Sequence, residues 1–127
     1  MTSHDQRPFE DAQIREAERR LIAALESPDP TAWVYEYAED AVFDAGGEHP
    51  ARGREALLAM ARSMRQLSNA SIRPLQTAGC GDLATVWFDG SWLSGPVPEA
   101  RRVFVRGVIV WRRQQDGRWR VALEHIS

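Results

Sequence analysis

The sequence predicts an α+β domain in which three N-terminal helices pack on one face of a curved, mainly antiparallel sheet. Apolar residues recur at helical spacing in the first half of the chain, and after Asn69 they alternate as in β-strands. Helices followed by an antiparallel meander are typical of this fold class. A length of 127 residues suits a single domain over residues 1–127, of which we expect residues 1–8 to be flexible.

Three helices are expected before Asn69. The first covers about residues 8–26, where apolar side chains recur every three or four positions. Asp29 suits a helix N-cap and Pro30 a first helical position, so a short aromatic helix is expected in TAWVYEYAED, residues 31–40. The third helix follows the turn GGEHPARG and carries an apolar stripe from Leu57 to Leu67.

The remaining segments are predicted to be strands. A brief strand is expected in AVFDA, residues 41–45, and a second short one within GGEHPARG. Four long strands are expected at residues 70–79, 83–94, 101–113 and 117–127. Pro74 lies inside the first of these four, and because proline has no backbone N–H to donate, it indicates an edge strand or a bulge.

The composition argues against several kinds of partner. The chain has 16 basic and 18 acidic residues, and a net charge of −2 does not favour nucleic acid or acidic lipid. No apolar run approaches the ~18 residues of a membrane span. Cys80 is the only cysteine, so no internal disulfide can form and a reducing cytoplasm is the expected location. Arginines concentrate on the last hairpin, where we expect a solvated, salt-bridged surface.

Neither a metal nor a cofactor is predicted. His4, His49 and His125 are far apart in the sequence and lack the spacing of a metal site. The turn GGEHPARG has neither the glycine spacing of a dinucleotide loop nor the lysine of a P-loop. The sequence also lacks the G-x-S-x-G element that serves acyl transfer.

The order of the segments resembles the nuclear-transport-factor-2-like superfamily. RLIAALESPDPTAWVYEYAEDAVFDAGGEHPARGREALLAM is similar to its front half, and GDLATVWF followed by VIVWRRQQDGRWRV is similar to its back half. The resemblance covers Ile14 to Ser127 and is strongest to the SnoaL-like branch, with ketosteroid isomerase more distant. It implies a cone-shaped, cystatin-like roll with a cavity at the wide end, a fold that hosts enzymes and ligand binders alike.

The resemblance does not extend to the machinery of ketosteroid isomerase. By this alignment, the positions of that enzyme's oxyanion tyrosine, general-base aspartate and protonated aspartate fall on Leu21, Ala45 and Ile109. All three are apolar, and alanine cannot remove a proton from carbon. That isomerase mechanism is therefore excluded.

The same resemblance implies which residues line the cavity. Glu124 supplies a carboxylate and Tyr37, expected on the short helix, supplies a phenol, and these two are the candidate catalytic residues. A pocket of this kind suits a small hydrophobic molecule with one polar handle. The other expected lining residues are Trp33, Phe43, Phe88, Trp92, Val105, Ile109, Ala122 and Ile126.

Glu124 and His125 are neighbours near the end of the last strand. Adjacent side chains of a strand point to opposite faces, so these two cannot line one cavity unless a bulge intervenes. If Glu124 faces apolar walls, its pKa rises and it becomes a candidate general acid or base. The alternative is a rim carboxylate that is solvated or paired with Arg52 or Arg106. For Tyr37 the alternative is a packing residue with a hydrated hydroxyl.

The last strand presents a conflict. Simple alternation would bury its apolar side chains at Trp119, Val121 and Leu123 and expose Glu124, the reverse of what the resemblance implies. The preceding strand, VRGVIVW, is apolar on both faces, which predicts a sheet that is covered on both sides. We therefore expect a homodimer through the outer sheet face, whose apolar residues are Trp87, Val108, Val110, Val121 and Leu123.

Three functions are compatible with these features. The first is a small-molecule enzyme, an isomerase, cyclase or dehydratase that uses Glu124 as its acid or base. The second is a binding protein that holds an apolar metabolite without reacting with it. The third is a dimeric interaction domain.

Overall fold

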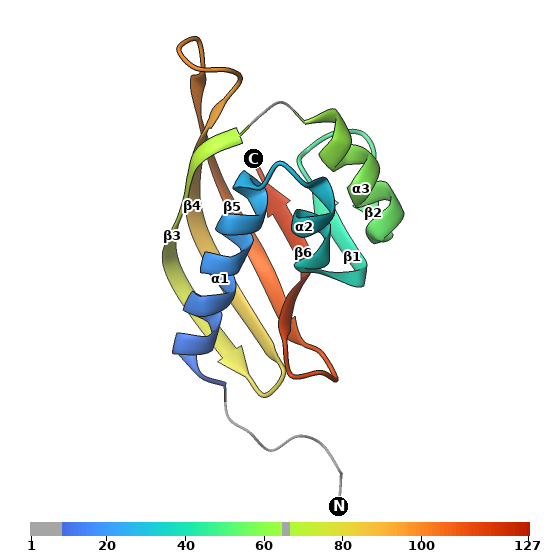
Figure 1. Ribbon diagram of the computed structural model, residues 1–127. Coiled ribbons are helices and arrows are strands. Elements are labelled where there is room, and N and C mark those ends of the chain that lie inside the picture. Colours follow the sequence, from blue (N-terminus) through green and yellow to red (C-terminus); the bar gives the residue numbers. More distant parts are fainter. Residues whose placement is uncertain (1–8, 65–66) are drawn as a thin grey trace, which may run out of the picture.

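The computed structural model describes residues 9–64 and 67–127. The expected flexible segment, residues 1–8, lies outside the described residues. Six strands form one curved sheet in the order β2-β1-β6-β5-β4-β3, and all neighbours are antiparallel except β1 and β6 (Figure 1). The strands are β1 (Tyr37–Asp44), β2 (Ala51–Arg52), β3 (Leu67–Cys80), β4 (Leu83–Ser94), β5 (Arg101–Arg113) and β6 (Trp119–Ile126). The predicted α+β class is confirmed.

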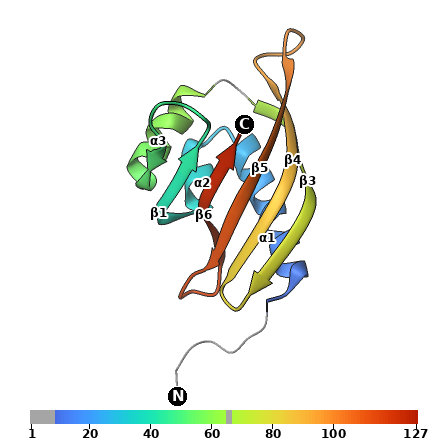
Figure 2. The same cartoon turned by 180° about the vertical axis from the view of Figure 1, so that it is seen from behind.

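Three helices lie on one side of the sheet: α1 (Asp11–Glu26), α2 (Pro30–Tyr35) and α3 (Gly53–Ser63). Helix α1 crosses the concave face, and the view from behind shows the outer face of β4, β5 and β6 without a covering helix (Figure 2). The apolar stripe of α1 is buried against the sheet at Ile14, Ala17 and Leu21. None of the described helices has the length and apolar character needed to cross a membrane.

The short second helix begins as predicted but ends earlier. The Asp29 side chain accepts a hydrogen bond from the Thr31 backbone N–H at 3.0 Å, and Pro30 occupies the first turn. The helix stops at Tyr35, so the expectation of a helix through residue 40 was wrong. The Glu36 carbonyl instead accepts the Val121 N–H at 2.9 Å, and Tyr37 begins β1 beside β6. Pairing with β6 outweighs any helical tendency of YAED.

Pro74 lies on an edge strand and beside a bulge, the two environments that its missing N–H indicates. β3 is the last strand of the sheet, and its register against β4 shifts between Pro74 and Gln76. Leu75, the extra residue, is exposed. The irregularity therefore falls where no further strand needs a regular ladder.

Candidate functional site

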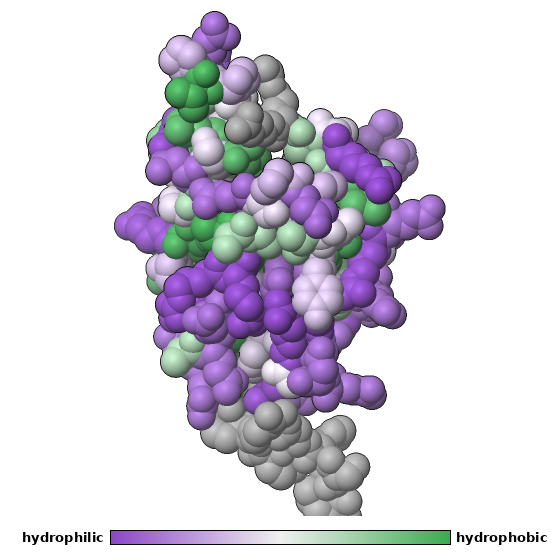
Figure 3. All heavy atoms as spheres, viewed as in Figure 1, coloured by the Kyte–Doolittle hydropathy of each residue, from purple (hydrophilic) through white to green (hydrophobic). Residues whose placement is uncertain are grey.

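A cavity of about 230 Å³ lies between the concave face of the sheet and the three helices. The end of α1, the residue after α3 and the start of β3 meet near the upper part of the molecule. There they contribute Leu25, Met64 and Leu67 to the cavity wall. Apolar side chains also gather near this part in the space-filling view, below the β4–β5 hairpin (Figure 3). The residues expected at the cavity that do line it are Trp33, Tyr37, Phe43, Phe88, Trp92, Val105, Glu124 and Ile126.

Two expected lining residues are placed elsewhere. Ile109 pairs with Glu124 across β5 and β6 but is completely buried in the core and does not reach the cavity. Ala122 is also absent from the wall, because it is the extra residue of a bulge. Both expectations were wrong: Ile109 faces inward from β5 but is covered by other core side chains, and the expectation for Ala122 assumed a regular alternation along β6.

This bulge determines which way Glu124 points. Across β5, Trp111 pairs with Val121 and Val110 pairs with Leu123, which leaves Ala122 without a partner. Val121 is therefore completely buried, and Glu124 faces the same interior three residues later. The bulge explains how Val121 can be buried, as simple alternation predicts, while Glu124 also faces inward, as the resemblance implies. It also corrects the expectation that Val121 belongs to the outer face.

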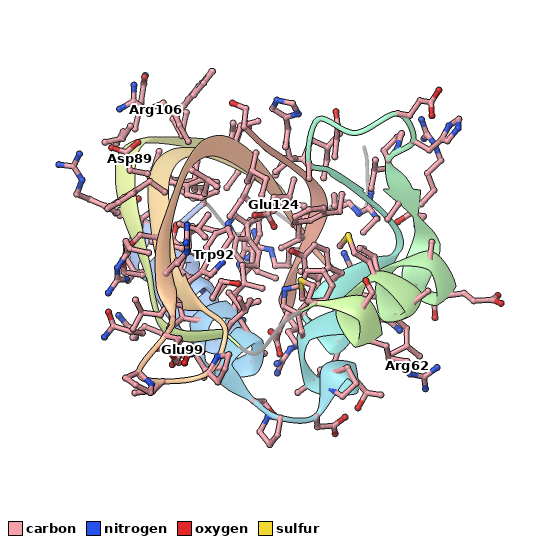
Figure 4. All side chains as sticks on the ribbon, turned by 90° about the horizontal axis from the view of Figure 1, so that it is seen from above. Arg62, Asp89, Trp92, Glu99, Arg106 and Glu124 are labelled. Atoms are coloured by element: carbon pink, nitrogen blue, oxygen red, sulfur yellow. The ribbon has the colours of Figure 1, made fainter. Side chains whose placement is uncertain are left out.

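Glu124 and Tyr37 meet at the cavity wall. They stand on neighbouring parallel strands, and the Tyr37 hydroxyl donates a hydrogen bond to Glu124 Oε1 at 2.5 Å. Glu124 is 8% exposed and Tyr37 is 1% exposed. Viewed from above, Glu124 and Trp92 both point into the space between the sheet and the helices (Figure 4). The carboxyl group thus has one fixed oxygen in an apolar surrounding.

The second carboxyl oxygen of Glu124 is open to the cavity. Among the described residues no group donates a hydrogen bond to Oε2. The buried side-chain oxygens and nitrogens that lack a partner include none from Glu124, so Oε2 keeps contact with open space. Because Glu124 lines the cavity, this oxygen is the polar atom that an occupant of the cavity would meet.

Burial sets the proton affinity of this pair. Loss of hydration raises the pKa of Glu124 from its ordinary 4.5 to about 7, although the hydrogen bond from Tyr37 acts in the opposite direction. Burial also raises the pKa of Tyr37 far above its ordinary value, and the nearby Glu124 charge adds to this rise. Near neutral pH the tyrosine is therefore a hydrogen-bond donor, while the carboxyl group exists in both protonation states.

His125 is separated from this pair by the strand itself. Its Nδ1 lies 3.1 Å from Asp44 Oδ2, and both side chains are partly exposed. Arg106, one of the arginines considered as a partner for Glu124, instead binds Asp89 at 2.7 Å on the outer side of the sheet. Among the described residues Glu124 has no ion-pair partner. Glu124 and His125 are not a catalytic dyad.

Several residues that line the cavity were not predicted from the sequence. The apolar stripe of α3 was assigned to packing alone, yet Met60 lines the cavity, and Ile72 of β3 does so too. The period-two pattern of β3 could have indicated Ile72, since its neighbours Ser71 and Arg73 are polar. The small residues Gly90 and Ser91 gave no comparable signal.

Comparison with known proteins assigns the family. The SnoaL-like domain family matches residues 19–122, which include Trp33 and Tyr37 and stop before Glu124. No curated protein matches the chain.

Solved structures share the fold. An NTF2-like protein of unknown function from Pseudomonas putida KT2440 is 25% identical, with a TM-score of 0.75 over 92% of this chain and 84% of that chain. A ketosteroid isomerase-like protein from Erwinia carotovora atroseptica SCRI1043 is 18% identical, with a TM-score of 0.76 over 94% of this chain and 97% of that one. An NTF2-like protein with a cystatin-like fold from Novosphingobium aromaticivorans is 21% identical, with a TM-score of 0.74 over 91% and 79% of the two chains. Because the family match covers most of the sequence and these folds agree with it, the chain belongs to the SnoaL-like domain family.

Proposed function

We propose that the protein binds a small, mainly apolar molecule in the cavity and engages the polar group of that molecule through Glu124. The observation that supports this most directly is the buried Glu124 with one oxygen held by Tyr37 and the other open to the cavity. A volume of about 230 Å³ is smaller than the ~300–1,000 Å³ of pockets that take drug-sized ligands, so one or two fused rings suit it.

The chemistry that suits this arrangement is proton transfer, as in an isomerase, cyclase or dehydratase. A general acid or base works best when its pKa lies near the working pH, and the pKa of Glu124 is about 7. Tyr37 acts as a positioning residue, because it holds Oε1 and leaves Oε2 to exchange the proton. In a protein that only binds its ligand, the same carboxyl group would fix the ligand's orientation without reacting.

Binding can be tested with indane and 2-indanone, which have the expected size. Titration into ¹⁵N-labelled protein should shift the backbone signals of residues around the cavity, such as Ile72, Phe88 and Val105. Ala45→Trp places an indole at the cavity rim and should abolish these shifts, whereas Gly47→Ala, where an added Cβ meets no atom within 4 Å, should keep them. The absence of shifts with both compounds would refute the proposed binding function.

Proton transfer has a separate test. In deuterium oxide the Glu124 carboxylate would remove a proton from a carbon beside the 2-indanone carbonyl, and the exchanged carboxyl group would return a deuteron to the same carbon. We expect faster deuterium uptake with the wild-type protein than without protein, and no acceleration with Glu124→Gln. Equal uptake with the wild-type protein and with Glu124→Gln would rule out Glu124 as the base. It would not contradict the proposed ligand binding.

A further inference from the structure

The charge and the aromatic content of the cavity wall together indicate the charge of the ligand that it binds. Among the described residues that line the cavity, Glu124 is the only charged one. Five of the lining residues are aromatic: Trp33, Tyr37, Phe43, Phe88 and Trp92. A single buried carboxyl group among aromatic rings differs from a wall that is merely apolar, because both components attract positive charge.

Three of these rings are grouped beside the carboxyl group. The ring centroids of Trp33 and Tyr37 are 4.7 Å apart, those of Trp33 and Phe43 are 5.8 Å apart, and those of Tyr37 and Phe43 are 6.4 Å apart. Their planes are inclined to one another by 58°, 71° and 59°, so no two rings are stacked face to face. Phe43 also pairs directly with Glu124 across β1 and β6. The aromatic group and the carboxyl group therefore form one site.

Charges on the surrounding elements do not neutralise Glu124. Arg54 of α3 donates hydrogen bonds to the Tyr37 carbonyl oxygen, at 2.9 Å for its Nη2, and lies 3.8 Å from Glu39. His125 of β6 faces the opposite side of the strand. On β5 the residue paired with Glu124 is Ile109, and on α2 the nearest site residue is Trp33. Tyr37 is the only other titratable side chain at the cavity wall among the described residues.

We propose that the cavity binds a small organic cation, a tertiary or quaternary ammonium group on an apolar ring, with the Glu124 carboxylate as its counter-ion and the Trp33–Tyr37–Phe43 group of rings on one side of it. This inference rests on the proposed ligand-binding function and specifies the charge of the polar handle. An anionic ligand would be repelled by ionised Glu124, and a neutral ligand would offer the carboxylate no counter-ion, so that the carboxyl group would keep its proton. A cation gains from both the carboxylate and the π-electrons of the rings.

Binding of such a cation is linked to a proton. The cation requires ionised Glu124, whose pKa of about 7 leaves part of the protein protonated at neutral pH. Binding near pH 7 therefore releases a proton, and affinity rises as pH increases through 7.

The test compares benzyltrimethylammonium with neopentylbenzene, which has the same shape and no charge, and with phenylacetate as an anion. At pH 8.5 we expect the cation to bind about tenfold more tightly than the hydrocarbon, as cation–π attraction and a buried counter-ion predict. At pH 5.5 this preference should largely disappear, and phenylacetate should not bind at pH 8.5. Calorimetry in two buffers of different ionisation enthalpy should show proton release on cation binding near pH 7.

Two glutamate variants show whether the preference for the cation comes from Glu124 or from the net charge of the protein. Glu124→Gln removes the carboxylate and should abolish the preference for the cation while hydrocarbon binding remains. Glu99→Gln makes the same change of charge at an exposed position outside the cavity wall and should behave as the wild type (Figure 4). Phe43→Leu should weaken binding of the cation more than that of the hydrocarbon.

The outcomes distinguish this inference from the proposed function. If the hydrocarbon binds and the cation binds no better at pH 8.5, the cation inference is wrong while ligand binding stands. If Glu99→Gln loses the preference as Glu124→Gln does, net charge explains it and the inference also fails. If no neutral or cationic probe binds, the proposed function itself is contradicted. The buffer calorimetry uses only the wild-type protein, so it remains decisive even if a variant folds poorly.

Discussion

Val121 and Glu124 face the same interior although three positions separate them on strand β6. Regular alternation would place them on opposite faces. The bulge at Ala122 adds one unpaired residue between them and so brings both side chains to the same face. Val121 thereby fills the core beside Trp111, and Glu124 reaches the cavity. The bulge lets one strand serve both purposes.

Changing the number of residues at this bulge tests the geometry. Deletion of Ala122 makes the alternation from Val121 to Glu124 regular, so Glu124 should still face inward and its pKa should stay well above the ordinary value. Insertion of one further alanine after Ala122 should turn Leu123 inward and Glu124 outward, which returns the Glu124 pKa towards 4.5. Carbon-detected NMR titration of the Glu124 carboxyl group measures both. The same pKa in the two variants would disprove the alternation argument.

Stability should fall as pH rises from 5 to 7. The folded state holds the Glu124 proton up to about pH 7, whereas the unfolded chain releases it near 4.5. The folded protein thus binds more protons in this window, and the resulting change in unfolding free energy between pH 5 and 7 is about 2 kcal/mol. Glu18, whose pKa burial also raises, adds a slope of the same sign. Urea denaturation across this range should show a much shallower slope for Glu124→Gln; an unchanged slope would count against the raised pKa.

Replacing Tyr37 with phenylalanine should raise the pKa of Glu124 further. The tyrosine hydroxyl stabilises the ionised carboxylate, and its removal leaves desolvation unopposed. We also expect a loss of about 1 kcal/mol of unfolding free energy, since a buried hydrogen bond is removed. Tyr35→Phe, at an exposed position on α2, is the matched control and should leave the titration unchanged. A lowered Glu124 pKa in the Tyr37 variant would contradict this account.

Gly107 should not tolerate a side chain. A Cβ at this position would come within 2.2 Å of the His125 carbonyl oxygen and 2.9 Å of Ile126 Cγ2, on the strand that carries Glu124. Because backbone must move to relieve the first contact, Gly107→Ala should cost about 1–3 kcal/mol of unfolding free energy. Gly47→Ala, which meets no atom within 4 Å, should be nearly neutral in the same urea denaturation experiments. Equal stability of the two variants would show that β5 and β6 separate easily here.

We propose that the outer face of the sheet pairs with a second copy of the chain. Trp87 is 52% exposed and Leu123 is 39% exposed on this face, which none of the described helices covers. Leu123→Arg and Val110→Arg should therefore give a monomer or an aggregate in sedimentation velocity. Leu75→Arg introduces the same charge at an exposed apolar position on the edge strand and should leave the assembly unchanged. A wild-type protein that sediments as a monomer would end this proposal.

The sequence predicts the long regular elements well and the irregular ones poorly. Helix α1 and strands β3 to β6 extend over enough residues for their periodicities to stand out, and Asp29 and Pro30 mark the start of α2. The end of α2 was misplaced because YAED has no strand pattern of its own and depends on pairing with β6. The bulge at Ala122 was likewise hidden, since only pairing with β5 shows which residue is extra. Ala122 was assigned to the cavity for the same reason, whereas Ile109 faces inward as predicted but is covered by the core.

The position of β6 also bears on how the domain is synthesised. It is the last of the six strands in chain order, yet it lies between β1 and β5 in the sheet. During translation β1 has only the two-residue β2 as a strand neighbour until the residues of β6 leave the ribosome. Contacts between residues so distant in sequence form slowly. Tyr37 is therefore made long before its partner Glu124, and the nascent chain must keep β1 available until that partner arrives.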